Sequence, residues 1–255
     1  MKLFAVGLLA VVLAMLAAVA VLTSHGGTSR SGATVVQERV ATGFSEIEVS
    51  GVADVTLVQG DREGVSLEGS GDALASIRTS THGRVLTIRA APAQRWWHMF
   101  PSGRAAPTVH VTVSLRKLER LEASGVIKVT AASLRGDQLR LDLSGACELR
   151  LAGLALSQLS TDASGASKLE LAGTVQRQFI DLSGAGSYRA GDLVSQTATI
   201  DVSGAGKALL NSSASLTVDI SGAGTVEYLG DPTIEQSVSG VGKIRRAKSA
   251  ATAAS

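Results

Sequence analysis

Aromatic residues, cysteine and net charge are all scarce in this sequence. Only 3% of the 255 residues are aromatic, whereas 45% are hydrophobic and 28 are glycine, so a core must be built from aliphatic and small side chains. Cys147 is the only cysteine, which excludes a disulfide framework or a cysteine-based metal site within one chain and leaves this residue as a small core side chain. A formal net charge of +2 gives no electrostatic basis for a nucleic-acid partner.

The two ends of the chain are expected to lie outside the folded domain. Lys2 is followed by an apolar or small run over residues 3–22, and Ala18-Val19-Ala20 is a cleavage site of the signal-peptide kind. The run also reaches the ~20 residues that span a bilayer. Residues 1–22 are therefore predicted to be a signal peptide or an N-terminal membrane anchor, the chain's one contact with a membrane. Residues 23–37 are predicted to be a Gly/Ser/Thr linker, and residues 247–255 a disordered tail.

A short motif, Ser-Gly followed by Ala or Val, recurs every 18 to 20 residues. Its copies begin at Ser124, Ser144, Ser164, Ser183, Ser203, Ser221 and Ser239, with an earlier one at Ser50. Self-similarity at a period near 20 is typical of a solenoid, in which each repeat stacks on its neighbours.

Alternation within each repeat predicts strands. Around the second copy, one parity holds Leu139, Leu141, Leu143, Gly145, Cys147, Leu149 and Leu151, and the other holds mostly polar residues. Strands that stack in parallel about 4.8 Å apart give an all-β fold: a single-stranded parallel β-helix of 18–20 residues per coil, with a right-handed sense expected. The glycine after each serine is expected at a corner, where the backbone bends or approaches the next coil. A β-sandwich needs no such constant corner.

Three stretches resemble one bacterial family. They are "F-x-x-I-x-V-S-G" at 44–51, "VHVTVSLRKLERLEASG" at 109–125, and the serial D-x-S-G-A-G copies. Together they resemble the "putative auto-transporter adhesin head GIN domain", over roughly residues 38–246. The resemblance implies a β-helical fold and export in bacteria, and its name points to an adhesin-like role.

One outward-facing position of the repeat is acidic in five successive copies: Asp142, Asp162, Asp181, Asp201 and Asp219. Neighbouring coils would hold these carboxylates about 5 Å apart, where two exposed charges repel by about 1 kcal/mol in water. They are candidate ligands for a row of weak Ca²⁺ sites. Alternatively, each aspartate accepts hydrogen bonds from its own Ser-Gly corner, which is favoured because the loops lack the Gly/Asp density of repeat calcium binders.

An insertion at 91–107, "APAQRWWHMFPSGRAAP", holds three of the chain's eight aromatic residues. Arg95, Trp96, Trp97 and Phe100 are candidate ligand-binding residues, because such side chains stack on sugar rings or enter a lipid interface. The same loop could instead serve as a hydrophobic lid over the solenoid. Near the C-terminus, Lys243, Arg245, Arg246 and Lys248 are expected to discourage pairing at the open strand edge.

The sequence predicts an exported protein of the periplasm or cell surface that acts as a non-enzymatic binding or structural module. Its expected partner is a glycan or another envelope protein, and no cofactor is expected. No catalytic residue is assigned, because a ladder of equivalent aspartates lacks the two unlike carboxylates of a glycosidase. The alternative is a polysaccharide lyase or hydrolase on the same scaffold.

Overall fold

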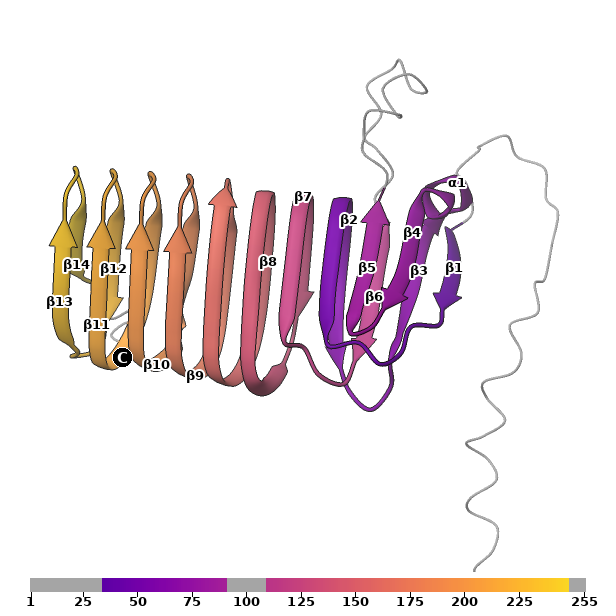
Figure 1. Ribbon diagram of the computed structural model, residues 1–255, viewed down its shortest axis with the longest axis horizontal. Coiled ribbons are helices and arrows are strands. Elements are labelled where there is room, and N and C mark those ends of the chain that lie inside the picture. Colours follow the sequence, from indigo (N-terminus) through magenta and orange to yellow (C-terminus); the bar gives the residue numbers. More distant parts are fainter. Residues whose placement is uncertain (1–33, 91–108, 248–255) are drawn as a thin grey trace, which may run out of the picture. The chain divides into compact units, whose positions relative to one another are not determined.

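The computed structural model describes residues 34–90 and 109–247. All of them belong to one compact unit with a continuous hydrophobic core. The fold is a β-solenoid of about six turns, seen in Figure 1 as a row of stacked coils. The predicted all-β, solenoidal class is confirmed.

The coils are built by strands that pair in parallel with the next strand along the row. These strands are β2 (Glu46–Gln59), β7 (Arg120–Ala131), β8 (Leu134–Gly165), β9 (Lys168–Leu182), β10 (Ser187–Val202), β11 (Lys207–Ile220), β12 (Thr225–Leu229), β13 (Thr233–Val238) and β14 (Lys243–Arg246). Leu121 pairs with Leu141, and Lys207 pairs with Thr225. The coil is therefore 20 residues long near β8 and 18 near β12, as the repeat spacing predicts.

Aliphatic side chains fill the interior in the predicted alternation on either side of the corner, where Ser144, Gly145 and Ala146 are all exposed. Leu141 and Leu149 are fully buried, whereas Ser144 and Arg150 face outward. Cys147 is only 2% exposed, and burial raises the pKa of its thiol. Because each leucine packs on its counterpart in the next coil, the parity of the repeat fixes which face is inside.

The corner glycines allow the coils to stack closely. Gly145 has φ +94°, and a Cβ there would lie 2.6 Å from the carbonyl oxygen of Gly125. The φ of Gly204 lies outside the left-handed region, yet a Cβ there would lie 2.2 Å from the carbonyl oxygen of Gly184. The later corners therefore need glycine for close approach alone, and the earlier corners need it for the bend as well.

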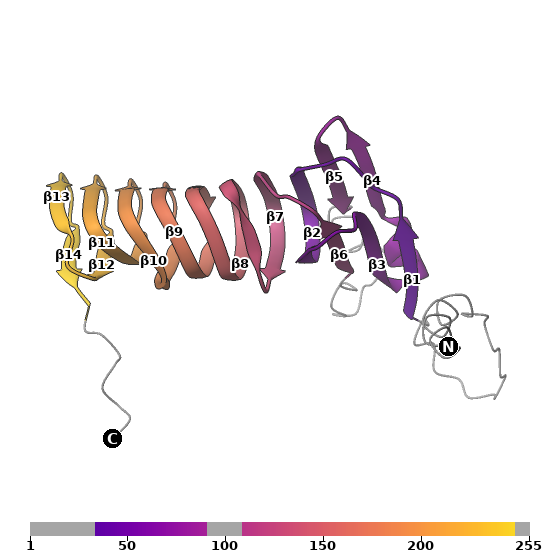
Figure 2. The same cartoon turned by 90° about the horizontal axis from the view of Figure 1, so that it is seen from below.

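The N-terminal end departs from the parallel repeat. Its elements are β1 (Thr34–Arg39), β3 (Gly64–Ser70), α1 (Gly71–Ala75), β4 (Ile77–His82), β5 (Val85–Ala90) and β6 (His110–Leu115). β5 and β6 pair in parallel with the two halves of β2 and complete one coil. β3, β1 and β4 then add antiparallel pairings beyond that coil, which Figures 1 and 2 show at the β1 end of the row.

The structure bears on two of the predicted domain boundaries. Residues 34–37, predicted to end the linker, lie in β1, because their backbone pairs with β3. Ala247, the first residue of the predicted tail, donates its N–H to the carbonyl oxygen of Tyr228. The predictions for residues 1–22, 23–33, 91–107 and 248–255 lie outside the described residues. Within the described ranges, no helix is both long and apolar enough to cross a membrane.

Candidate functional site

The coils present an acidic face. It is the outward surface of the segments that precede the Ser-Gly corners, and its central column consists of Glu48, Glu122, Asp142, Asp162, Asp181, Asp201 and Asp219. The strand register aligns Glu48 with Glu122, Glu122 with Asp142, and Asp162, Asp181, Asp201 and Asp219 with one another. Gly165 lies against Gly145 of the preceding coil, which places Asp162 beside Asp142. The predicted aspartate column therefore exists as a continuous row.

The aspartates of this column differ in their surroundings. Asp142 pairs with Arg120 at 2.7 Å and with Arg140 at 2.8 Å. By contrast, burial raises the pKa of Asp181, and the charges of Asp162 and Asp201 raise it further. Asp181 is thus flanked by two carboxylates, whereas the charge of Asp142 is balanced by two arginines.

The described contacts of the later aspartates show neither the expected hydrogen bonds from the Ser-Gly corners nor a group of side chains that could hold a cation. The Ser164 hydroxyl donates to the carbonyl oxygen of Leu143, and among the described residues no hydrogen bond joins Asp162, Asp181, Asp201 or Asp219 to a corner serine. In the same part of the chain, no group of three His, Cys, Asp or Glu side chains is placed to hold a metal ion. The calcium sites stay a prediction, and they would need oxygen ligands from outside this column.

Changing Asp181 to Asn is expected to stabilise the protein at neutral pH by about 0.5 kcal/mol at low salt, because solvent screens these exposed charges. The folded-state pKa of Asp181 is raised, so the folded state binds the proton more tightly than the unfolded state. Stability therefore falls as pH rises from about 4 through the folded-state pKa, and the variant should remove this loss. Thermal unfolding measured across pH 3 to 7 checks the expected change.

Asp142→Asn is the matched control. Because Asp142 pairs with two arginines, its removal should lower the melting temperature at neutral pH. An equal effect of the two substitutions would contradict the assigned difference in environment.

The segments that follow the Ser-Gly corners form a basic face. Two columns run along it. The lysine column contains, in register order, Lys128, Glu148, Lys168, Ser187, Lys207, Thr225 and Lys243, and the arginine column contains Thr130, Arg150, Glu170, Arg189, Leu209, Glu227 and Arg245. Their parity places both columns on the outside of the solenoid.

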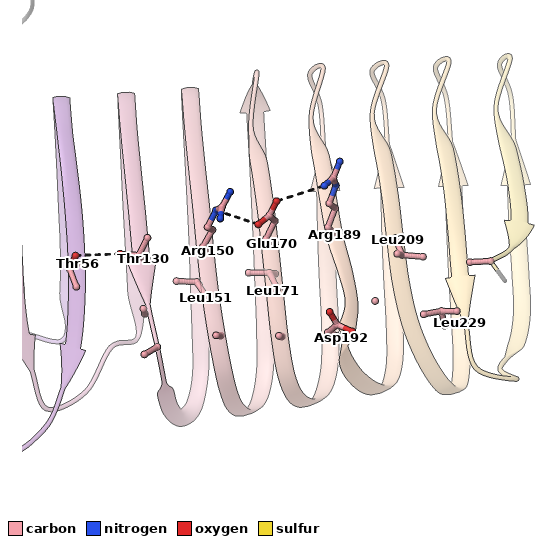
Figure 3. A pocket seen from close by; sticks show the side chains of 16 residues that line it. Thr56, Thr130, Arg150, Leu151, Glu170, Leu171, Arg189, Asp192, Leu209 and Leu229 are labelled. Atoms are coloured by element: carbon pink, nitrogen blue, oxygen red, sulfur yellow. Dashed lines mark hydrogen bonds and ion pairs between the residues drawn. The ribbon is translucent and has the colours of Figure 1, made fainter. Parts of the chain in front are cut away.

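A groove of about 900 Å³ borders the arginine column and crosses the coils from Thr56 on β2 to Leu229 on β12. Figure 3 shows it with the strands running across it. Small residues line it where each coil turns out of this face: Ala132, Ala152, Ala172 and Gly191. Because these side chains are short and their neighbours in the arginine column are long, the surface is hollowed along the row.

Ion pairs join the charged side chains that form the wall of the groove. Glu170 lies between two arginines, 3.3 Å from Arg150 and 3.8 Å from Arg189, as the dashed lines in Figure 3 show. Lys168 approaches Glu170 to 2.9 Å. This hydrogen bond, with the charges of the arginines, lowers the pKa of Glu170. Leu209 and Leu229 are half-buried and extend the apolar lining toward β12.

A second hollow of about 360 Å³ opens on the same face. Arg189, Lys207 and Arg245 contribute to its lining. Arg189 and Leu209 border both hollows. The basic face therefore brings cations and concave apolar surface together along the row of coils.

Sequence reasoning placed the acidic column but missed the groove. The sequence signal for the groove is the pair "RLAG" at 150–153 and "ELAG" at 170–173. In both copies a small residue stands two positions after a charged one, in successive coils. The predicted ligand-binding residues Arg95, Trp96, Trp97 and Phe100 lie outside the described residues.

Comparison with known proteins identifies the family. The model of the family described as "Putative auto-transporter adhesin, head GIN domain" matches residues 43–232, and the chain belongs to this family. The comparison with curated proteins gave no match.

Solved structures share the fold at low sequence identity. A putative adhesin from Bacteroides fragilis NCTC 9343 has a TM-score of 0.76 and 21% identity, over 85% of this chain and 98% of the other. A putative lipid binding protein from Parabacteroides distasonis ATCC 8503 has a TM-score of 0.63 and 19% identity, over 86% and 98%. A putative adhesin from Parabacteroides merdae ATCC 43184 has a TM-score of 0.59 and 19% identity, over 86% and 98%. At these identities the likeness shows the fold alone.

Proposed function

We propose that the protein is a non-enzymatic binding module of the bacterial cell envelope, and that it holds an elongated ligand in the groove of the basic face. The observation that carries this proposal is that one groove crosses successive coils and is lined by similar residue types in several of them. A polymer that lies along the row would make related contacts at each step. The family description and the apolar run at residues 3–22 support an adhesin-like, exported module.

A polysaccharide fits the chemistry of the groove. Small and aliphatic side chains such as Ala152, Ala172 and Leu209 can contact the apolar faces of sugar rings, and the wall offers Arg150, Glu170 and Arg189 to hydroxyl groups. The groove crosses many coils, so it suits a chain that continues beyond the protein rather than a compact small molecule.

Glu170, one of the two carboxylates that line the groove with Asp192, favours binding over cleavage. A glycosidase needs one carboxylic acid whose pKa is raised, so that it can protonate the leaving oxygen. Glu170 is held ionised instead, because Lys168 and the neighbouring arginines lower its pKa. It therefore supports orientation of a ligand rather than proton donation.

Filling the groove tests this function. Ala152 is exposed, so Ala152→Trp should fold normally and block the groove. We expect the purified variant to bind polysaccharide at least about tenfold more weakly, which corresponds to about 1.4 kcal/mol. The assay is calorimetry against a panel of neutral and acidic polysaccharides, with thermal unfolding of each variant alongside.

Ala155→Trp is the matched control, because Ala155 is also exposed on β8 but lies outside the groove. It should bind as the unaltered protein does. Equal losses in the two variants, no loss in Ala152→Trp, or no binding of any polysaccharide by the unaltered protein would contradict the proposed function.

A further inference from the structure

We propose that the ligand of the basic face is an acidic polysaccharide that carries a negative charge on every second sugar. This inference rests on the proposed function and names the ligand class of the same groove. Three observations lead to it: the excess of cations on this face, their alternation from coil to coil, and their position beside the groove.

Cations outnumber anions on the basic face. Its two columns contain the cations Lys128, Lys168, Lys207, Lys243, Arg150, Arg189 and Arg245, and the anions Glu148, Glu170 and Glu227, with Asp54 opposite Lys128. The columns thus hold seven cations against four anions, and Asp192 in the groove lining adds a fifth anion. Within the described ranges, Lys207 and Lys243 form no ion pair, and Lys128 approaches Asp54 only to 4.0 Å. Several cations therefore keep their charge available to a ligand.

The lysines occupy alternate coils. Lys128, Lys168, Lys207 and Lys243 are separated in the register by Glu148, Ser187 and Thr225, one residue per intervening coil. Strands in a sheet are about 4.8 Å apart, so successive lysines stand about 10 Å apart along the row. A sugar ring in an extended glycan advances the chain by about one strand spacing. A glycan charged on every second sugar would therefore present one carboxylate to each lysine.

The arginines occupy the coils between the first lysines. Arg150 lies on the coil between Lys128 and Lys168, and Arg189 on the coil between Lys168 and Lys207. Both border the groove. Rings seated on the small residues of the groove would therefore have Arg150 and Arg189 along one side, with Glu170 between them. A guanidinium can bind a carboxylate through two parallel hydrogen bonds.

The acidic face of a second copy is a poorer match. Its carboxylates occur on every coil, at Asp162, Asp181, Asp201 and Asp219. Half of them would meet Glu148, Ser187 or Thr225 instead of a lysine. The alternation therefore favours a polymer whose charges repeat every two units over lateral association of identical solenoids.

The test compares three probes against the purified protein: hyaluronan, which has a carboxylate on every second sugar; carboxyl-reduced hyaluronan, which has none; and polygalacturonate, which has one on every sugar. We expect hyaluronan to bind most tightly, with an affinity that falls as salt is raised. The variant Lys168→Gln/Lys207→Gln/Lys243→Gln should bind it at least about tenfold more weakly, since each exposed charge contributes about 0.5 to 1 kcal/mol.

The control variant makes the same change in net charge elsewhere. Arg62, Arg135 and Arg177 are exposed and lie outside the two columns of the basic face, so Arg62→Gln/Arg135→Gln/Arg177→Gln should leave the affinity within about twofold. Equal losses in both triple variants would overturn the inference, because only net charge would then matter.

The remaining outcomes separate this inference from the proposed function. If carboxyl-reduced hyaluronan binds as tightly as hyaluronan, the acidic class is wrong and the groove still binds glycan. If polygalacturonate binds more tightly, the two-unit spacing is wrong. Salt-sensitive self-association that is lost both in the lysine variant and in an Asp181→Asn/Asp201→Asn variant would replace the polysaccharide with a second copy. Failure of every glycan, neutral ones included, would overturn the proposed function as well.

Discussion

Gly204→Ala is expected to destabilise the protein by about 3 kcal/mol or more, enough to threaten folding. The new Cβ would lie 2.2 Å from the carbonyl oxygen of Gly184. This oxygen accepts a hydrogen bond from the N–H of Ala205, so moving it disturbs the pairing of two coils. The φ of Gly204 lies outside the left-handed region, and the loss therefore reports close stacking alone. Urea unfolding with an unchanged m-value is the measurement.

Two glycines away from the corners serve as controls. Gly83 has φ +59°, and a Cβ at this position would have no atom within 4 Å, so Gly83→Ala should cost about 1 to 2 kcal/mol through backbone strain. A Cβ at Gly60 would have no atom within 4 Å, and the φ of Gly60 lies outside the left-handed region. Gly60→Ala should therefore change stability by less than about 0.5 kcal/mol. A loss in Gly204→Ala no larger than that in Gly60→Ala would contradict the role assigned to the corners.

Tyr188→Ala is expected to cost about 3 to 5 kcal/mol, because it leaves a cavity where the largest fully buried side chain stood. Tyr188 and Phe44 are the two buried aromatic rings of the described core, and Tyr188 is the larger. Its hydroxyl donates to Gln178 Oε1 at 2.9 Å. The Nε2 of Gln178 and the hydroxyl of Thr161 are buried without a partner, so this polar cluster is incompletely satisfied.

Smaller changes divide the effect of Tyr188 into packing and hydrogen bonding. Tyr188→Phe should cost about 1 to 3 kcal/mol, because it leaves the Gln178 oxygen unpaired. The double variant Tyr188→Phe/Gln178→Leu removes both partners and should recover most of that loss. Additive losses in a double-mutant cycle would contradict the pairing.

The same tyrosine predicts a loss of stability at high pH. Burial raises the pKa of Tyr188 well above its ordinary value. Above about pH 10 the unfolded chain loses the phenolic proton and the folded chain keeps it, so the free energy of unfolding falls as pH rises. Tyr188→Phe should flatten this dependence in urea unfolding at about pH 9 to 11. An unchanged slope would show that the hydroxyl titrates freely in the folded state.

The repeating part of the fold follows directly from the sequence. Leu141 and Ser144 illustrate why: a period of two fixes the inside and outside of a strand, and one constant corner fixes where each coil turns. The antiparallel N-terminal end does not follow in the same way. Val65 and Leu67 of β3 alternate with polar residues as the coil strands do, and this pattern carries no information on strand direction.

The two faces differ in how visible they are in the sequence. Asp181 sits beside the Ser-Gly motif, so its column is found by aligning the copies. The groove lies at the other corner, where the register shifts between Leu151 and Leu154 and between Arg189 and Asp192. Its lining includes several alanines, which give no chemical signal. Only the stacked coils show that these small residues form a continuous hollow.

Methyl NMR of the purified protein, titrated with the tightest-binding polysaccharide of the panel, tests the central claim most directly. The groove methyls of Ala152, Ala172, Leu209 and Leu229 should shift on binding. The methyls of Ala155 and Val194, which lie around another hollow, should not. This result would place the ligand in the groove. Shifts confined to Ala155 and Val194, or binding without any shift in the groove, would contradict the account.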